Sequence, residues 1–306
     1  MTHLELLNVV LTWRFEQPGW PPVLAHAGYI VDAVGVCLFL PDRRRKIVPE
    51  VVATCADRGF TALIEVKSGR NAEDDQLRRM LEISPADLRD LNHLSIPGPE
   101  KHNVFVVYVC NAGELDRFAA QVNDDRVGVV GFDGTRYSLA GSFPDQELAR
   151  ELAAAVVPSG GGPLPIVPFD QDSSPATIAR CVLPELVAVL TSGGGVVSVD
   201  GILMRTHGVV LEVMRPTGSG SGAELKSLRR RVVEVINDAM GNEFSAWFER
   251  LSQDQSWRFK RSLPHDSAGK TRDLQTLRRA ADQLLARLGE TPSIQLTIPF
   301  VGPTQQ

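Results

Sequence analysis

Short apolar segments alternating with amphipathic ones restrict the folds open to this chain more than any other feature. Apolar, largely β-branched runs predict buried strands at 28–40, 60–67, 104–110 and 127–132. Helical spacing of apolar residues and helix stop signals predict helices at 3–15, 48–58, 72–82, 113–122 and 145–157. Alternating strands and helices indicate an α/β domain, which we place at residues 1–157.

The remainder of the chain has a different pattern. Residues 158–175 are rich in Pro, Gly and Ser and predict a linker. From 176 to 306 we expect a mostly helical accessory domain, with helices at 175–191, 223–240, 243–251 and 271–288 and a short strand at 256–261. The flexible GSGSG loop at 218–222, the Arg-rich helix and the strand together suit a winged-helix-like domain. The alternative to a winged-helix-like domain is that the Arg-rich segment forms an amphipathic helix that simply packs on its neighbours.

Charge and cysteine content narrow the class of protein. The net charge is −5, so attraction to a polyanion requires a local basic patch. The four cysteines lack CxxC spacing, which argues against a zinc site and favours a reducing cytoplasm. We find no secretion signal and no run approaching the ~18 apolar residues of a membrane span. These features predict a cytoplasmic protein with no membrane partner.

Three charged residues within the apolar strand segments are the candidates for metal binding and catalysis. Asp32 follows Gly-Tyr-Ile-Val, and Glu65 and Lys67 flank Val66 in the segment ALIEVKSG. Strand interiors rarely hold such groups unless they are paired or bound to a metal. Glu65 and Lys67 share one face of their strand because side chains alternate. Two carboxylates and an ammonium on one sheet face would hold a divalent cation such as Mg²⁺.

The choice of Asp32 as the second carboxylate depends on strand pairing. If segments 28–40 and 60–67 pair directly as antiparallel strands, the start of the first lies beside the end of the second. Asp32 would then lie near Glu65. Asp42 follows a proline but falls at the opposite end of such a hairpin, so we rank it below Asp32 without excluding it.

Asp32 with Glu65-Val66-Lys67 resembles the PD-(D/E)xK, or restriction-endonuclease-like, nuclease superfamily. The resemblance covers about the first half of the chain and implies a mixed sheet flanked by helices. It further implies that the Val66 carbonyl helps to hold Mg²⁺, with Mn²⁺ as a substitute, and that Gln76 on the next helix helps to build the site. Many members add an acidic residue from the first helix; Glu5 is our candidate and Glu16 the second. The chain departs from the family pattern in lacking a proline before Asp32 and in having a helix-sized insertion between the strands.

The expected function is metal-dependent endonuclease activity on nucleic acid, with DNA favoured over RNA. The resemblance extends to nuclease subunits of bacterial restriction or anti-phage defence systems, in which an ATPase subunit recognises the target. A homo-oligomer is also compatible with the sequence. The alternative is a non-catalytic adaptor that keeps the nuclease fold as a scaffold.

The accessory domain carries the residues that we expect to bind nucleic acid or a partner. The first 158 residues hold 16 Lys and Arg against 22 Asp and Glu, leaving 16 against 15 in the remainder. Basic residues are densest in two stretches, and these supply our candidates: Arg229, Arg230, Arg231, Arg258, Lys260 and Arg261. Trp257 and Phe259 would add base stacking.

Overall fold

A computed structural model of the 306-residue chain divides into two compact units. It describes residues 1–42, 44–69, 74–94, 96, 102–122, 124–159, 162–191, 195–208, 210–214, 223–251, 255–260 and 267–289. Unit 1 comprises Met1–Val167 and Val209–Leu225, and unit 2 comprises Pro168–Gly208 and Lys226–Gln306. Arg261 therefore lies outside the described residues, as does the GSGSG segment.

Unit 1 is built on a mixed six-stranded sheet with the order β1-β4-β5-β6-β7-β8. The strands are β1 (Ile30–Val34), β4 (Val51–Cys55), β5 (Phe60–Lys67), β6 (Asn103–Asn111), β7 (Val127–Phe132) and β8 (Tyr137–Gly141). β5, β6 and β7 run parallel, and the other neighbouring strands pair antiparallel. A separate two-stranded ribbon joins β2 (Leu38–Phe39) to β3 (Lys46–Ile47).

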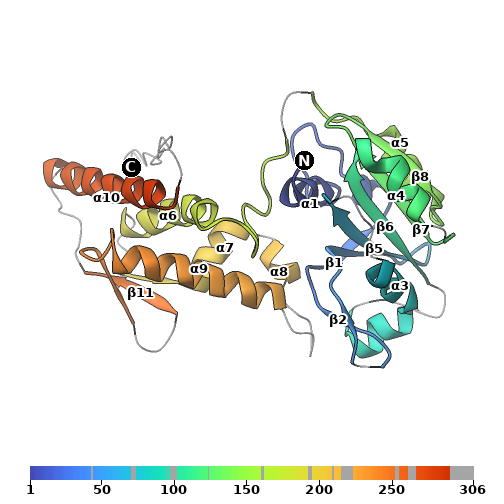
Figure 1. Cartoon of the computed structure of the whole chain (residues 1–306), viewed down its shortest axis with the longest axis horizontal. Helices are drawn as coiled ribbons and strands as arrows, with labels where there is room; N and C mark the ends of the chain where they lie inside the picture. Colours follow the sequence, from blue (N-terminus) through green and yellow to red (C-terminus); the bar gives the residue numbers. More distant parts are fainter. Residues whose placement is uncertain are drawn as a thin grey trace, which may run out of the picture. The chain divides into compact units, whose positions relative to one another are not determined.

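Helices flank this sheet (Figure 1). They are α1 (His3–Thr12), α2 (Val23–His26), α3 (Asp74–Glu82), the π-helix η1 (Asp87–Leu91), the 3₁₀ turn η3 (Ala112–Glu114), α4 (Leu115–Gln121), α5 (Gln146–Ala154) and α8 (Val210–Met214). The α3 and α4 helices pack on one face of the sheet, where Leu63 and Val106 join Met80 and Phe118 in a single core. The α1 helix contacts β5 and β6, and all of its residues from Leu6 to Thr12 are buried.

The predicted helix at 48–58 is wrong. Residues 51–55 form β4, which lies between β1 and β5 and pairs antiparallel with both. Val51, Val52 and Thr54 are β-branched and favour a half-buried strand over a helix. The direct pairing expected between segments 28–40 and 60–67 is therefore also wrong, and the residues thought to be an insertion are the central strand of this antiparallel trio.

Other boundaries differ more modestly from the prediction. The segment 28–40 divides into β1 and β2, and β8 was not anticipated. The first part of the predicted linker packs within unit 1: Asn8 accepts hydrogen bonds from the backbone of Ile166 and Val167 and donates one to the Val167 carbonyl. The α8 segment also belongs to unit 1, so the first unit is not confined to residues 1–157.

Unit 2 combines helices with a small antiparallel sheet. Its helices are α6 (Pro175–Thr191), α7 (Val199–His207), most of α9 (Ala223–Gly241) and α10 (Ser267–Arg287). Its strands β9 (Val196–Ser198), β10 (Phe248–Arg250) and β11 (Ser256–Phe259) have the order β10-β11-β9. The predicted helix at 243–251 is wrong, since its second half is β10. Within the described residues, we find no helix with the length and apolar character needed to cross a membrane.

Candidate active site

Glu65 and Lys67 lie at the carboxyl end of β5, beside the parallel strand β6. Strand alternation places both on the face of the sheet that α3 covers, as the sequence predicts. Across the neighbouring strand, Val51 pairs with Ile64, so the next residue on each strand brings Glu50 opposite Glu65. The second carboxylate of this site is therefore Glu50.

Three side chains form a closed set of contacts at this edge. The Lys67 ammonium lies 2.9 Å from Glu65 Oε1 and donates to Gln76 Oε1 at 2.8 Å. Gln76 Nε2 donates to the same Glu65 oxygen at 2.9 Å. The structure thus brings together Glu65, Lys67 and Gln76, three of the four residues that the sequence assigned to catalysis.

The other carboxylate oxygen of Glu65 has a different environment. Oε2 is buried and has no hydrogen-bond partner among the residues that the structure describes. Burial and then repulsion from Glu50 raise the pKa of Glu65 to about 7, against the opposing influence of Lys67 and Gln76. A buried carboxylate with one unpartnered oxygen and a second carboxylate nearby is an arrangement that a bound cation would stabilise.

His3 extends the site from the amino terminus of α1. Its Nε2 lies 2.7 Å from Glu50 Oε1, and the Glu50 side chain is only 13% exposed. The start of α1 is anchored at the carboxyl end of β6, where the amino terminus of Met1 donates to Asn111 Oδ1. The first helix therefore does contribute a side chain near the carboxylates, but it is a histidine.

Glu5, the acidic residue expected in that role, has another function. Its carboxylate accepts the Thr2 backbone N–H at 2.7 Å while the Thr2 hydroxyl accepts the Glu5 backbone N–H, which forms a capping box. The Thr2 backbone hydrogen bond is the main reason that the pKa of Glu5 is lowered. Glu5 thus stabilises the start of α1, and we do not include it in the proposed site.

Asp32 is not opposite Glu65. It lies at an irregularity in β1 between Val31, which pairs with Ala53, and Ala33, which pairs with Val52. Because β4 separates β1 from β5, the two backbones are about 10 Å apart at ~4.8 Å per strand. Burial raises the pKa of Asp32 to about 6, a hydrogen bond from Thr54 opposes that shift, and Oδ2 has no partner in the described part of the chain.

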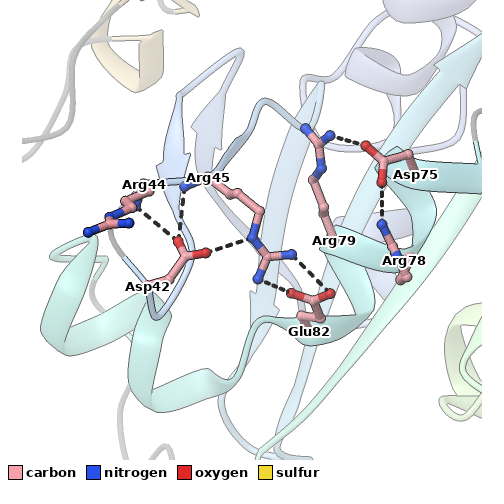
Figure 2. Close-up of polar contacts among 7 residues, drawn as sticks. All are labelled: Asp42, Arg44, Arg45, Asp75, Arg78, Arg79 and Glu82. Carbon is pink, nitrogen blue, oxygen red and sulfur yellow. Dashed lines mark hydrogen bonds and ion pairs between the residues drawn. The ribbon is translucent and has the colours of Figure 1, made fainter.

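Asp42, the alternative to Asp32, belongs to a surface network of ion pairs. It accepts hydrogen bonds from the backbone of Arg44 and Arg45 and from the Arg45 side chain, which also contacts Glu82 of α3 (Figure 2). The backbone hydrogen bond from Arg45 is the largest influence that lowers the pKa of Asp42 to about 2. These contacts hold the turn between β2 and β3, so Asp42 does not replace Asp32 as a site residue.

The basic residues predicted to bind nucleic acid are mostly engaged inside unit 2. Ion pairs join Arg229 to Asp200, Arg230 and Arg231 to Glu234, and Arg258 to Glu249. Arg231 also donates to the Ser173 carbonyl, and Lys260 donates to the Ser245 carbonyl. Trp257 is completely buried, so the predicted base stacking by Trp257 is wrong.

Sequence reasoning missed Glu50 and His3. The signal for Glu50 was the Pro49-Glu50 pair directly before the apolar, β-branched segment VVATC. Interpreting that segment as a helix removed Glu50 from consideration. No comparable signal marks His3, because its proximity to Glu50 arises from the way α1 packs across the sheet.

The donor set fits a hard divalent cation. Glu50 and Glu65 supply carboxylate oxygens, and Mg²⁺ is commonly held by one or two carboxylates with water and substrate phosphate oxygens completing its shell. No group of three or more His, Cys, Asp or Glu side chains within the described ranges is arranged to hold a metal by itself. Substrate or water oxygens would therefore have to complete the coordination shell.

Comparison with known proteins gives one match. Residues 2–133 match the family described as the MJECL32 domain, a span from α1 to the end of β7 that includes Glu50, Glu65, Lys67 and Gln76. That description names no activity. No curated protein and no solved structure shows significant similarity to the chain.

Proposed function

We propose that unit 1 is a metal-dependent nuclease that hydrolyses phosphodiester bonds at a site built from Glu50, Glu65 and Lys67. The observation that carries this proposal is the environment of Glu65. One of its oxygens is held by Lys67 and Gln76, and the other is buried, unpartnered in the described residues and close to a second carboxylate.

Glu50 and Glu65 would hold Mg²⁺ or Mn²⁺, with the Val66 carbonyl as a further oxygen ligand implied by the resemblance. When bound, such an ion supplies Lewis acidity toward a phosphate oxygen and lowers the pKa of an attacking water. Lys67 extends from the same strand face as Glu65 and is 13% exposed, so its ammonium can contact both an incoming water and the phosphate charge.

Gln76 and His3 position the reacting groups. Gln76 bridges Lys67 and Glu65, which fixes the ammonium relative to the carboxylate. His3 holds one oxygen of Glu50, which restricts that side chain to one orientation. Hydrogen bonds to ligand side chains of this kind orient them before a metal binds.

The fold of unit 1 supports a restriction-endonuclease-like assignment. The chain runs from α1 through antiparallel β1, β4 and β5 to α3 and then to β6, parallel to β5. The Glu-x-Lys sequence lies on β5, and an acidic residue preceded by proline, Pro49-Glu50, stands where β4 begins. Glu50 in the place of the family's Asp makes the motif complete without Asp32.

Cleavage assays test the proposal. Purified full-length protein should cut plasmid or linear DNA with Mg²⁺ or Mn²⁺ and lose that activity in EDTA. Glu50→Gln, Glu65→Gln and Lys67→Ala should each reduce the rate by about 100-fold or more, since they remove groups that act in the transition state. Asp42→Asn is a matched control that removes one carboxylate from unit 1 and should retain activity.

The rival function is a non-catalytic scaffold. Under it, no preparation cuts DNA or RNA with either metal, and cleavage by contaminants would be unaffected by the three substitutions. Either result would overturn the nuclease proposal.

A further inference from the structure

Each of the two carboxylates in the proposed site has one oxygen that a protein donor already occupies. Glu50 Oε1 lies 2.7 Å from His3 Nε2. Glu65 Oε1 lies 2.9 Å from the Lys67 ammonium and accepts a hydrogen bond of the same length from Gln76 Nε2. The pair therefore offers an incoming cation one oxygen from each carboxylate instead of two.

The remaining oxygen of each carboxylate has no such donor. Glu65 Oε2 is buried and unpartnered, and Glu65 as a whole is only 4% exposed. Glu50 Oε2 likewise accepts no hydrogen bond from another residue in the part of the chain that the structure describes. A buried carboxylate oxygen without a donor is costly, so a cation would bind through these two oxygens first.

The occupied oxygens are also held against rotation. Gln76 is itself fixed, because its Oε1 accepts from Lys67 at 2.8 Å while its Nε2 donates to Glu65. Glu65 is thus tied to donors on two elements, β5 and α3. His3 comes from a third element, α1, and the side chain of its partner Glu50 is only 13% exposed. Neither carboxylate can turn both of its oxygens toward one ion without breaking these contacts.

We propose that His3 and Gln76 make the site selective for Mg²⁺ or Mn²⁺ over Ca²⁺, by limiting each carboxylate to one ligand oxygen. Mg²⁺ requires a nearly ideal octahedron and is usually held by one or two carboxylates, with water and phosphate oxygens filling the rest. Ca²⁺ takes about six to eight oxygens and often binds a carboxylate through both. The inference rests on the metal site of the proposed function and adds which ions that site accepts.

Competition against Mn²⁺, with the 306-residue chain and no nucleic acid, tests the inference. Free Mn²⁺ is followed by its EPR signal while Mg²⁺ or Ca²⁺ is added. The readout is the ratio of the Ca²⁺ dissociation constant to the Mg²⁺ dissociation constant. The two ions carry equal charge, so this ratio largely cancels the purely electrostatic effect of a substitution. A change in the folded fraction alters the number of sites but leaves the ratio unchanged.

The wild type should bind Mg²⁺ more tightly than Ca²⁺. His3→Leu frees Glu50 Oε1, and Lys67→Met with Gln76→Leu frees Glu65 Oε1. His3→Leu should weaken Mg²⁺ binding by about tenfold because Glu50 loses its orientation, whereas Ca²⁺ can gain the freed oxygen and should keep its affinity. The ratio should therefore fall by about tenfold in this variant, and it should also fall in the second.

Two further variants separate positioning from a general structural role. His3→Gln restores an N–H donor and should return the ratio toward the wild-type value. His26→Leu removes the imidazole of another His–Glu pair in unit 1, formed with Glu151, and should leave the ratio unchanged. The His3 side chain is 40% exposed, so the His3 variants keep the test decisive should the variant at Lys67 and Gln76 fold poorly.

The inference and the proposed function fail in different ways. A wild-type ratio in His3→Leu would overturn the inference, as would tighter binding of Ca²⁺ than of Mg²⁺ by the wild type. Equal ratios for His3→Gln and His3→Leu would also overturn it, because the imidazole would then act through its volume. Mn²⁺ binding that is absent from the wild type, or retained in Glu65→Gln, would refute the metal site and with it the proposed function. If the wild type binds and selects Mg²⁺ but cuts neither DNA nor RNA, the nuclease proposal alone fails.

Discussion

Replacing Asp32 by Asn separates the site that the structure indicates from the one that the sequence suggested. Asp32 lies on β1, across β4 from Glu65, and its pKa is raised to about 6 from 3.8 by burial. A carboxylate that coordinates a metal would be needed for activity. A carboxylate that is merely buried lowers stability when it ionises.

The magnitude follows from the shift in pKa. Between about pH 4 and pH 6 the folded state binds more protons than the unfolded state, so the free energy of unfolding falls as pH rises. The rise of the Asp32 pKa from 3.8 to about 6, at 1.36 kcal/mol for each pKa unit, gives a full penalty of about 3 kcal/mol above that window and none below it. Burying the amide of Asn has its own smaller cost, so we expect Asp32→Asn to gain about 1–2 kcal/mol above pH 7.

Urea denaturation of both proteins at several pH values, without divalent metal, measures this difference. The Asn variant should match the wild type near pH 4, exceed it above pH 7, and keep metal-dependent cleavage. The reasoning is refuted if the variant is less stable than the wild type at pH 8. Loss of cleavage as complete as in Glu65→Gln would instead show that Asp32 belongs to the active site.

Further substitutions test individual contacts. Gln76→Ala should lower cleavage by about 10–100-fold without unfolding the protein, because the bridge between Lys67 and Glu65 is lost; an unchanged rate would remove Gln76 from the site. Asp42→Asn should leave cleavage unchanged and make stability less sensitive to salt, as measured by thermal melts, since its partners lie on the surface. Gly128→Ala should destabilise unit 1 by about 1–3 kcal/mol in denaturant titrations, because an added Cβ would lie within 2.5 Å of the Phe143 ring, whereas Gly113→Ala meets no atom within 4 Å and should have little effect.

The sequence predicted β5, β7 and α6 with their observed bounds, because the apolar residues of each form a clear pattern and the ends of each segment are well marked. It also predicted that Glu65, Lys67 and Gln76 would lie together. Glu65 and Lys67 follow from a local rule, because alternation along one strand places both on the same face. Gln76 was implied by the resemblance to the nuclease superfamily. Alternation along a strand depends on a few consecutive residues and can be anticipated from the sequence.

Predicting Glu50 as a site residue required knowledge of strand pairing, which a local sequence pattern does not contain. Its position opposite Glu65 depends on the register of β4 with β5, and the segment after it was assigned to the wrong secondary structure. Once a strand was missing, the nearest acidic residue on an apolar strand was Asp32, and it was therefore chosen as the partner of Glu65. The burial of Trp257 was missed for a related reason, since its indole packs toward a helix about twenty residues earlier in the chain.

The partners predicted from the resemblance stay predictions. The engaged arginines of unit 2 show why counting basic residues is a poor guide to binding, because intramolecular acids already pair with several of them. Purification of the protein from its native cells tests for the ATPase subunit that the resemblance implies, and for the homo-oligomer that we also predict.

Locating Mn²⁺ by anomalous diffraction from crystals of the full-length protein tests the central claim most directly. We predict one strong peak between the Glu50 and Glu65 carboxylates, with metal–oxygen distances of roughly 2.0–2.4 Å, and loss of that peak in Glu65→Gln. A peak bound by Asp32 instead, or no peak near Glu50 and Glu65 at saturating Mn²⁺, would contradict the account.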